Sequence, residues 1–513
     1  MPSGEGTDHS LRLNAARVAY ADARYDDALA GLDGCEDWPI ALAEFAVLLK
    51  AETLLRRDNA AALAWLAATN DLVATGEATF QRELLTARAL GNVRNFNGAE
   101  ERINRARALL EHVPGGAPKV AFQTARLKWF RREATPGDED IALALTDPDP
   151  AARAAAFSVR AWSHAALGDY RAQIADLSEA LRVAASAGYR CDVATLGTIV
   201  HSLARIAFEI ADAEGMAVAR AAYEGIRWTS DVRVHQFQTL RALGLDAFMR
   251  GEVARAQWLF RDASAVAPTP PFVALAHLDR SFVARIMHNE AWALDELDEA
   301  VRIARGVAWG QTFGEERIAL VALATLLAPT NAAEAQRHAA TYSMLGVESV
   351  SPMFALSQEK RAVAAETFAL ARIDQTLGNT ESAERGCREA YAVYEPIEHH
   401  YQAMLIATTL KELTGDPHWT ERALLHASHY PGCPIGNTTR QSNDRVDPVY
   451  QALTPLQRQI ARAHWSGADA AALSAQFSRS RYTVEHQLAA IYDAFGVDAA
   501  GTLRNEAVRR GLV

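Results

Sequence analysis

The sequence of 513 residues lacks long hydrophobic runs, paired cysteines and an apolar amino terminus. The longest apolar candidate, residues 318–328, is shorter than the ~18 residues that a membrane-spanning helix needs. The first ten residues are polar, which predicts neither a signal peptide nor a transit peptide. Cys35, Cys191, Cys387 and Cys433 lie far apart, so we expect neither a disulfide framework nor a zinc ribbon. This pattern favours a reducing cytoplasm and no membrane association.

The motifs of common enzyme classes are also missing. No Gly-Lys dipeptide occurs, which excludes a phosphate-binding P-loop. No nucleophile, base and orienting residue can be assembled, and we therefore expect no catalytic residues, no cofactor and no enzymatic activity. His426 and His429, near Cys433, have the spacing of a metal-binding pair, but two such histidines on an amphipathic helix more often serve packing. We predict no metal site.

Lysine is scarce, with five among 52 basic residues, and alanine is abundant, which is typical of a high-GC bacterial genome. A net charge of −11 and 50% hydrophobic residues indicate an acidic globular protein. A chain of this length exceeds what one hydrophobic core supports, so it should fold as several domains or as a solenoid.

Strand signals are nearly absent, whereas apolar residues recur at intervals of three and four, the period of a helix. A longer period resembles the tetratricopeptide repeat in its small, aromatic and proline positions. The best match comprises Leu240, Leu243, Gly244, Gly251, Ala256, Phe260, Ala263 and Pro268. Weaker matches begin at Ala16, Phe157 and Leu370. An irregular helical bundle is the alternative to this interpretation.

Small residues on the second helix of each repeat allow its first helix to approach closely. They fall at positions 28, 62, 99, 256 and 383, with Gln173 in the equivalent place. The intervals of 34, 37, 74, 83 and 127 residues correspond to one, one, two, two and three repeats of roughly 34–45 residues. We predict an all-α solenoid of about nine or ten hairpins over residues 11–430, with degenerate repeats around Gly215 and Asn331. Its right-handed superhelix would offer a concave binding surface.

The chain is predicted to be loop-like at two places. Residues 1–10 are expected to form a disordered tail. Residues 431–450 are rich in Gly, Pro and Asn without an apolar period, which indicates a linker between domains.

A separate helical module is predicted for residues 451–513. Thr454 and Gln457 can form a capping box, Gly467 would close the first helix, and Asp469 and Ser480 can cap the next two. Ala472, Leu473 and Phe477 are the expected inner residues of the second helix. Val484, Leu488, Ile491 and Phe495 form a buried stripe on the third.

This module resembles the LuxR-type DNA-binding domain, a four-helix fold around a helix-turn-helix. The matching residues are Gly467, Thr483, Val484, Leu488, Ile491, Tyr492, Gly496, Val497, Leu503, Gly511 and Leu512. The resemblance implies that residues 480–495 form the recognition helix. The residues it assigns to DNA contact are Arg479, Arg481, Tyr482, Thr483, Glu485, His486 and Gln487.

Several positions depart from the family pattern. The usual basic residue after Thr-Val is Glu485, the usual histidine is Gln487, and Ala470-Ala471-Ala472 replaces polar, basic and acidic residues. A carboxylate repels phosphate, although it can accept from a cytosine amino group. Residues 451–513 contain seven arginines and five acidic residues, so their net charge is +2, whereas the net charge of the remainder of the chain is −13.

A candidate effector site lies in the best-matched repeat, whose first helix is predicted over Val232 to Met249. His235, Gln238 and Arg241 follow one stripe at a spacing of three, and Trp228 could provide an apolar wall. Arg241 could pair with a ligand carboxylate. A polar outer face is the alternative for these residues.

Together these features favour a cytoplasmic bacterial transcription regulator. Its repeats would bind a peptide, a small ligand or a protein, and its C-terminal module would bind DNA as a homodimer. The alternative is an interaction adaptor whose helix-turn-helix no longer binds DNA and serves dimerisation or contact with RNA polymerase.

Overall fold

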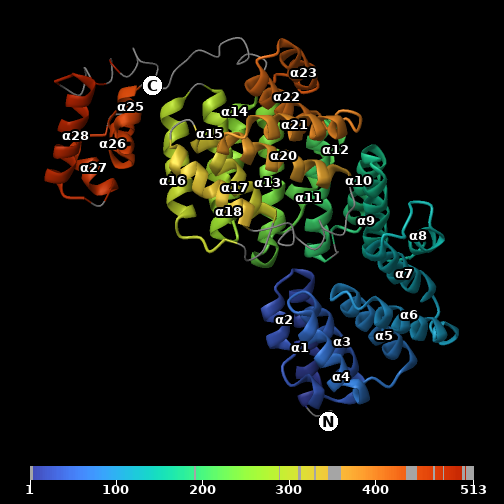
Figure 1. Ribbon diagram of the computed structural model, residues 1–513. Coiled ribbons are helices and arrows are strands. Elements are labelled where there is room, and N and C mark those ends of the chain that lie inside the picture. The colour runs from blue at the N-terminus through green and yellow to red at the C-terminus, as the bar shows by residue number, and fades with distance from the viewer. Residues whose placement is uncertain are drawn as a thin grey trace. The chain divides into compact units, whose positions relative to one another are not determined.

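The computed structural model describes residues 4–189, 192–287, 289–309, 314–328, 331–344, 360–434, 448–465, 468–477, 479–498, 503 and 506. Within these residues the regular structure is helical, without a β-strand (Figure 1). The all-α prediction is therefore confirmed.

Eleven helical hairpins can be traced in the described part of the chain. In chain order, the pairs are α1 (Gly4–Ala21) and α2 (Tyr25–Gly31), α3 (Ile40–Leu55) and α4 (Asn59–Ala68), α5 (Gly76–Asn92) and α6 (Phe96–Ala108), α7 (Ala117–Arg131) and α8 (Glu139–Ala144), α9 (Pro150–Leu167) and α10 (Tyr170–Ser186), α11 (Val193–Glu209) and α12 (Ala213–Gly225), α13 (Arg233–Met249) and α14 (Val253–Val266), α15 (Pro270–Ile286) and α16 (Glu290–Ala304), α17 (Gly314–Leu327) and α18 (Ala332–Met344), α20 (Lys360–Leu377) and α21 (Thr380–Tyr394), and α22 (His400–Thr414) and α23 (Pro417–Ala427). A short 3₁₀ helix, η4 (Ser230–Val232), precedes α13. The C-terminal helices are α25 (Pro448–Ala452), α26 (Pro455–Trp465), α27 (Ala470–Gln476) and α28 (Arg481–Phe495).

The chain divides into two compact units. The N-terminal unit comprises residues 1–242 and 352–363, and the C-terminal unit comprises residues 243–351 and 364–513. First helices of neighbouring hairpins contact one another within a unit, as α3 contacts α5, α5 contacts α7, and α15 contacts α17. These contacts stack successive hairpins within each unit.

The repeat period is confirmed by one recurring position. Each predicted close-packing residue is the fourth residue of a second helix, and each is buried. They are Ala28 in α2, Ala62 in α4, Ala99 in α6, Gln173 in α10, Ala256 in α14 and Ala383 in α21. Counting from Ala28 to Ala383 gives ten hairpins, as the spacing predicts. The eleventh, α22–α23, carries no match to this position, which is why the sequence count falls short.

Gly244 shows why a small residue is needed on a first helix as well. A Cβ atom placed there would lie 2.8 Å from the ring of Phe260 on α14. Phe260 itself is fully buried. Glycine therefore brings α13 and α14 close enough for the aromatic ring to fill the space between them.

The amino terminus differs from its prediction. Helix α1 begins at Gly4 and so includes residues that were expected to belong to a disordered tail. His9 stacks on Trp38 with ring centroids 5.0 Å apart. Arg12 lies over the same indole ring, 5.0 Å from its centroid. These ring contacts tie the first turns of the helix to the following hairpin, a long-range interaction that local composition does not reveal.

The end of the repeat array is joined to the α13–α14 turn of the C-terminal unit. Gly251 and Gly432 both have positive φ, of 77° and 87°. Their backbones touch, because a Cβ on Gly432 would lie 2.5 Å from the carbonyl oxygen of Arg250. Residues 435–447, within the predicted linker, lie outside the described residues, and α25 begins at Pro448, before the predicted end of the linker.

We expect Gly432→Ala to destabilise the protein by more than the ~1–2 kcal/mol that a non-glycine residue costs in the left-handed region, because the added methyl also meets backbone. Gly415→Ala is the matched control. Gly415 has a similar φ of 69°, but a Cβ there has nothing within 4 Å. Urea unfolding of both full-length variants measures the difference, and equal losses would exclude the backbone contact.

None of the described helices is long and apolar enough to cross a lipid bilayer.

Candidate functional site

The C-terminal helices begin at the residues that the sequence predicts. The Thr454 amide donates to the Gln457 side-chain oxygen (2.9 Å), and the Gln457 amide donates to the Thr454 hydroxyl (3.3 Å). Asp469 accepts from the amides of residues 471 and 472, and Ser480 accepts from the amide of Thr483 (3.1 Å). The capping-box and N-cap predictions are confirmed. Gly467 and the terminal residues 507–513 lie outside the described residues.

These helices share one apolar core. It contains the predicted stripe of α28, in which Val484, Leu488, Ile491 and Phe495 are all buried. Leu473 of α27 is buried and Phe477 is partly buried, but Ala472 is exposed, which corrects its prediction as an inner residue. The correction follows from helix geometry, because adjacent residues project ~100° apart and Leu473 already faces the core.

A hydrogen bond also joins α26 to α28. The His464 Nδ1 lies 2.7 Å from the carbonyl oxygen of Ala468, and its Nε2 lies 2.7 Å from the Tyr492 hydroxyl. A carbonyl can only accept, so Nδ1 carries the proton and Nε2 accepts from Tyr492. This arrangement fixes the orientation of α28 with respect to α26.

The core of the module extends onto a helix of the repeat array. Ala291 and Leu294 of α16 are buried in the same apolar cluster as α26 and α28. Arg458 of α26 is buried, donates to the Leu453 carbonyl oxygen (3.0 Å) and pairs with Asp298 of α16. One of the seven arginines of the module is therefore used inside the C-terminal unit.

The predicted DNA-contacting residues lie at the start of α28 and just before it. Tyr482 is 79% exposed, and Arg479, Arg481, Glu485 and His486 are exposed as well. Thr483 and Gln487 are only half-exposed. The structure thus brings together five solvent-facing side chains of the predicted set.

The charges within this group are partly neutralised. The Arg481 Nε lies 2.8 Å from Glu485 Oε1, one helical turn away. The Thr483 hydroxyl bonds to the Ser480 hydroxyl (2.7 Å), and both act in the cap. Arg479 has no acidic partner within the described part of the chain. It is therefore the most available cation of this surface, whereas Ala471 and Ala472 on the neighbouring helix add exposed methyl groups and no charge.

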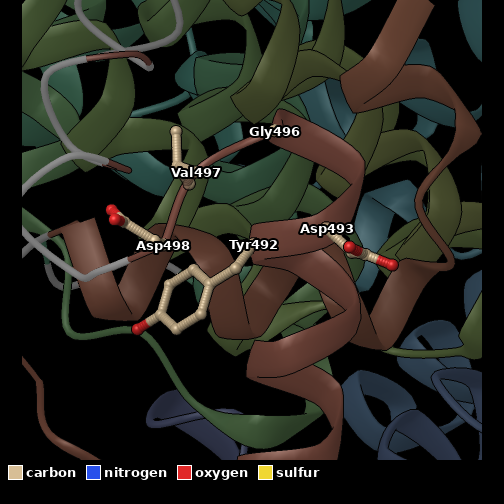
Figure 2. A pocket seen from close by; sticks show the side chains of 5 residues that line it. All are labelled: Tyr492, Asp493, Gly496, Val497 and Asp498. Atoms are coloured by element: carbon tan, nitrogen blue, oxygen red, sulfur yellow. The ribbon is translucent and has the colours of Figure 1, made fainter.

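An open hollow of about 450 Å³ lies at the other end of α28. It is lined by Tyr492, Asp493, Gly496, Val497 and Asp498 (Figure 2). The two carboxylates point away from each other, so they do not converge on a common point in the hollow (Figure 2). The lining is acidic and lies at the opposite end of α28 from Arg479.

The predicted effector stripe lies on α13, in the N-terminal unit. His235 faces α11, where its Nε2 lies 3.3 Å from the Thr198 hydroxyl and its ring lies 6.0 Å from that of His201. Gln238 and Arg241 are half-buried and already engaged in interactions. Trp228 packs on Tyr223 at 5.1 Å and donates to its carbonyl oxygen (2.9 Å). Binding of an effector by these four residues remains a prediction.

Burial lowers the pKa of His235 to about 4 and the pKa of His201 well below its ordinary value. Arg205 and His235 further disfavour the charged form of His201, while Asp192 favours the charged form of His235. Both imidazoles are therefore neutral at pH 7, and this interior surface carries no histidine charge.

Three histidines of the last hairpin, His400, His426 and His429, lie together. His400 stacks on His429 at 3.5 Å, and its Nδ1 lies 3.3 Å from Nδ1 of His426. The other nitrogen of His426 lies 2.9 Å from the Tyr391 hydroxyl. Among the described residues no group of three His, Cys, Asp or Glu side chains is arranged to hold a metal ion.

A second polar cluster, not foreseen from the sequence, lies inside the N-terminal unit. Asp192 caps α11 through Thr195, accepts from the Tyr25 hydroxyl (3.0 Å), and pairs with Arg56 at 2.7 Å. Burial opposes ionisation, but Arg56 and the Thr195 bonds hold the pKa of Asp192 below its usual value. Asp231 of η4 likewise accepts from the Tyr25 amide (3.1 Å). These bonds join the first two hairpins to α11 and η4.

Arg56 belongs to a set that recurs with the repeats. Arg56, Arg88, Arg126 and Arg160 lie on or directly after the first helices α3, α5, α7 and α9. Their intervals of 32, 38 and 34 residues are those of the hairpins, and this periodicity is the signal from which the sequence could have identified them.

Comparison with known proteins returns helical structures of low similarity. No protein-family model matches the chain, and no curated protein matches it in sequence. A Rap protein complexed with competence and sporulation factor is 12% identical, with a TM-score of 0.30 over 81% of this chain and 99% of that one. The APC/C hetero-tetramer Cut9-Hcn1 is 13% identical, with a TM-score of 0.20 over 82% of this chain and 96% of that one. Naa15/Naa10 bound to HypK-THB is 13% identical, with a TM-score of 0.22 over 98% of this chain and 78% of that one. These similarities assign no ligand or partner to this chain.

Proposed function

We propose that the protein is a cytoplasmic bacterial transcription regulator of the LuxR type, and not an enzyme. In this proposal α28 binds DNA, and the helical repeats bind a peptide, small-molecule or protein effector. The observation that carries the proposal is the surface at the start of α28. Arg479, just before the cap residue Ser480, and Tyr482 and His486 on the capped helix are exposed to solvent, while the opposite face of the helix is buried.

The chemistry of these side chains suits a duplex. Arg479 can bind a phosphate, and Tyr482 and His486 lie one turn apart on the exposed face of α28, where both can reach the same groove. Arg481 is held by Glu485, so it must leave this pair or use a second nitrogen before it contacts DNA. With few free cations per module, specific binding would rely on a homodimer that pairs two weak half-sites.

Three substitutions test the DNA-binding proposal. Arg479→Ala should weaken binding to all sequences alike and lower the slope of log affinity against log salt by about 0.9. Arg481→Ala should also weaken binding and lower the salt slope. Glu485→Lys changes the local charge by two units and releases Arg481, so it should strengthen non-specific binding and steepen the salt dependence. Gel-shift titrations of the full chain across a salt series measure all three.

Arg255→Ala is the control, because Arg255 is an exposed arginine on α14 paired with Glu252. It should leave both affinity and salt slope unchanged. If Arg479→Ala, Arg481→Ala and Glu485→Lys all behave like this control, DNA binding through α28 is wrong.

One observation favours a second function. Neutralisation of Arg481 by Glu485 and the exposed Ala471 and Ala472 leave a surface with little positive charge. An adaptor could use this surface, with Tyr482 at its centre, for dimerisation or contact with RNA polymerase. Tyr482→Ala would then abolish self-association or polymerase binding, measured by ultracentrifugation with and without polymerase, while no variant changes DNA binding.

A further inference from the structure

The arginines of the four successive first helices differ in how they are neutralised. Arg56 pairs with Asp192 at 2.7 Å, and the Arg88 Nη1 lies 3.8 Å from the Glu52 carboxylate. Arg160 makes two bonds to Asp176, of 2.9 and 2.6 Å. Three of the four cations therefore have a carboxylate from the protein.

Arg126 is the exception. Its Nη2 donates to the side-chain oxygen of Asn92 (2.5 Å), and its guanidinium lies 4.9 Å from the centroid of the Phe130 ring. Neither group carries a negative charge, and no carboxylate of the described residues pairs with Arg126. Burial, together with Arg88 and Arg56, lowers the pKa of Arg126 to about 9.

Uncharged hydrogen-bonding groups surround this cation. The Asn92 amide donates to the side-chain oxygen of Asn59 (2.8 Å), which leaves its own oxygen directed at Arg126. Gln123 lies one turn before Arg126 on α7 and is half-buried. It lines the same small recess as Arg126 and Phe130, and its amide has no hydrogen-bond partner among the residues described.

A half-buried cation without an anion costs free energy, and a structural role alone would favour a carboxylate partner of the kind that Arg56 and Arg160 have. We propose that Arg126, assisted by the Gln123 amide, binds a carboxylate group of the effector. A guanidinium with one neighbouring amide suits the planar, singly charged carboxylate, which it can bind through two parallel bonds. A phosphate dianion would need a further free cation, and Arg88 and Arg56 are already paired.

This inference rests on the proposed sensor role of the repeats and is independent of DNA binding. The carboxylate can come from the C terminus of a peptide or from a small organic acid. The probes are therefore succinate, acetyl-pentaalanine with a free C terminus, its C-terminal amide, and inorganic phosphate. Calorimetry and thermal unfolding of the full-length protein measure binding at constant ionic strength.

We expect saturable binding of succinate or of the free-acid peptide, and at least a tenfold loss in Arg126→Gln. The amidated peptide identifies the source, because only a C-terminal carboxylate is lost on amidation. Arg131→Gln, on the same helix but paired with Glu100 at the surface, should bind as wild type does. Arg126→Lys retains the charge without the planar fork and should bind more weakly than wild type, which tests the site even if the glutamine variant fails to fold.

Stability provides an independent measure. Because Arg126 has no anion in the free protein, Arg126→Gln should unfold at the same temperature as wild type or higher, and succinate should raise the unfolding temperature of wild type alone. Binding retained in Arg126→Gln, binding of phosphate without carboxylate, or no binding by any probe would overturn the site. If the wild-type protein binds no DNA in the gel shifts while the Arg126 results are as expected, the regulator proposal is wrong and the carboxylate site is still supported.

Discussion

Replacement of Asp192 by alanine is expected to destabilise the N-terminal unit by about 3 kcal/mol, because it leaves the largely buried Arg56 guanidinium, whose side chain is 17% exposed, without its anion. The same substitution removes the cap of α11 and the acceptor of the Tyr25 hydroxyl. Urea unfolding of the full-length chain, followed by circular dichroism, measures the loss in the first transition.

A double-mutant cycle separates the ion pair from the other bonds of Asp192. Arg56→Ala alone should also be destabilising, and the double variant should lose much less than the two single losses combined, since neither charge is then left unpaired. Asp27→Ala, which removes an exposed ion pair with Arg24, is the control and should cost less than about 1 kcal/mol. Additive losses at Arg56 and Asp192 would contradict the coupling.

Acidification from pH 7 to pH 4 is expected to destabilise the N-terminal unit, and the contribution of His235 to this loss is roughly 3 kcal/mol. The pKa of His235 is lowered from 6.5 to about 4 in the folded protein, so the unfolded chain binds the proton more tightly. This contribution is complete above pH 6.5 and is lost as the pH falls toward 4. His201 acts in the same direction, because burial lowers its pKa as well. Asp192, whose pKa is also lowered, loses its contribution only at lower pH, below its ordinary value of 3.8.

The measurement is the free energy of urea unfolding at intervals across this pH range. His235→Gln should flatten the curve between pH 6.5 and 4 by roughly one proton, because glutamine does not titrate. Gln236→Ala, on the neighbouring position of α13, keeps the histidine and should keep the wild-type curve. An unchanged curve in His235→Gln would show that other groups cause the acid response.

The repeat architecture could be predicted because its strongest constraint is local and periodic. A small residue at the fourth position of the second helix lets the first helix approach, and alanine recurs there at Ala62, Ala99 and Ala256, although Gln173 takes the same place in α10. The helix caps Asp469 and Ser480 were predictable for the same reason, since a cap bonds within three residues of itself. The right-handed sense of the superhelix stays a prediction.

The polar interior could not be predicted, because its partners are distant in sequence. The sequence around Asp192 predicts a helix cap, but no neighbouring residue indicates that Arg56 of another hairpin pairs with it. The repeat spacing can mark Arg126 as one of four periodic arginines, but its lack of a carboxylate partner becomes visible only when Asn92 and Phe130 are placed beside it. From the sequence, Arg458 is likewise one of the cations that could bind DNA, and only the structure shows that it pairs with Asp298.

The sharing of an apolar core between α16 and the C-terminal helices has a consequence for modularity. A fragment that begins after residue 447 would be deprived of Ala291 and Leu294 and of the carboxylate of Asp298, so it would start with an open hydrophobic face and an orphaned Arg458. Chimaeras that exchange this module between proteins would therefore need to carry the α16 surface with it. In evolutionary terms, substitutions on α16 and α26 would be coupled. The unit that evolves together would then include α16 and would not begin at the predicted linker.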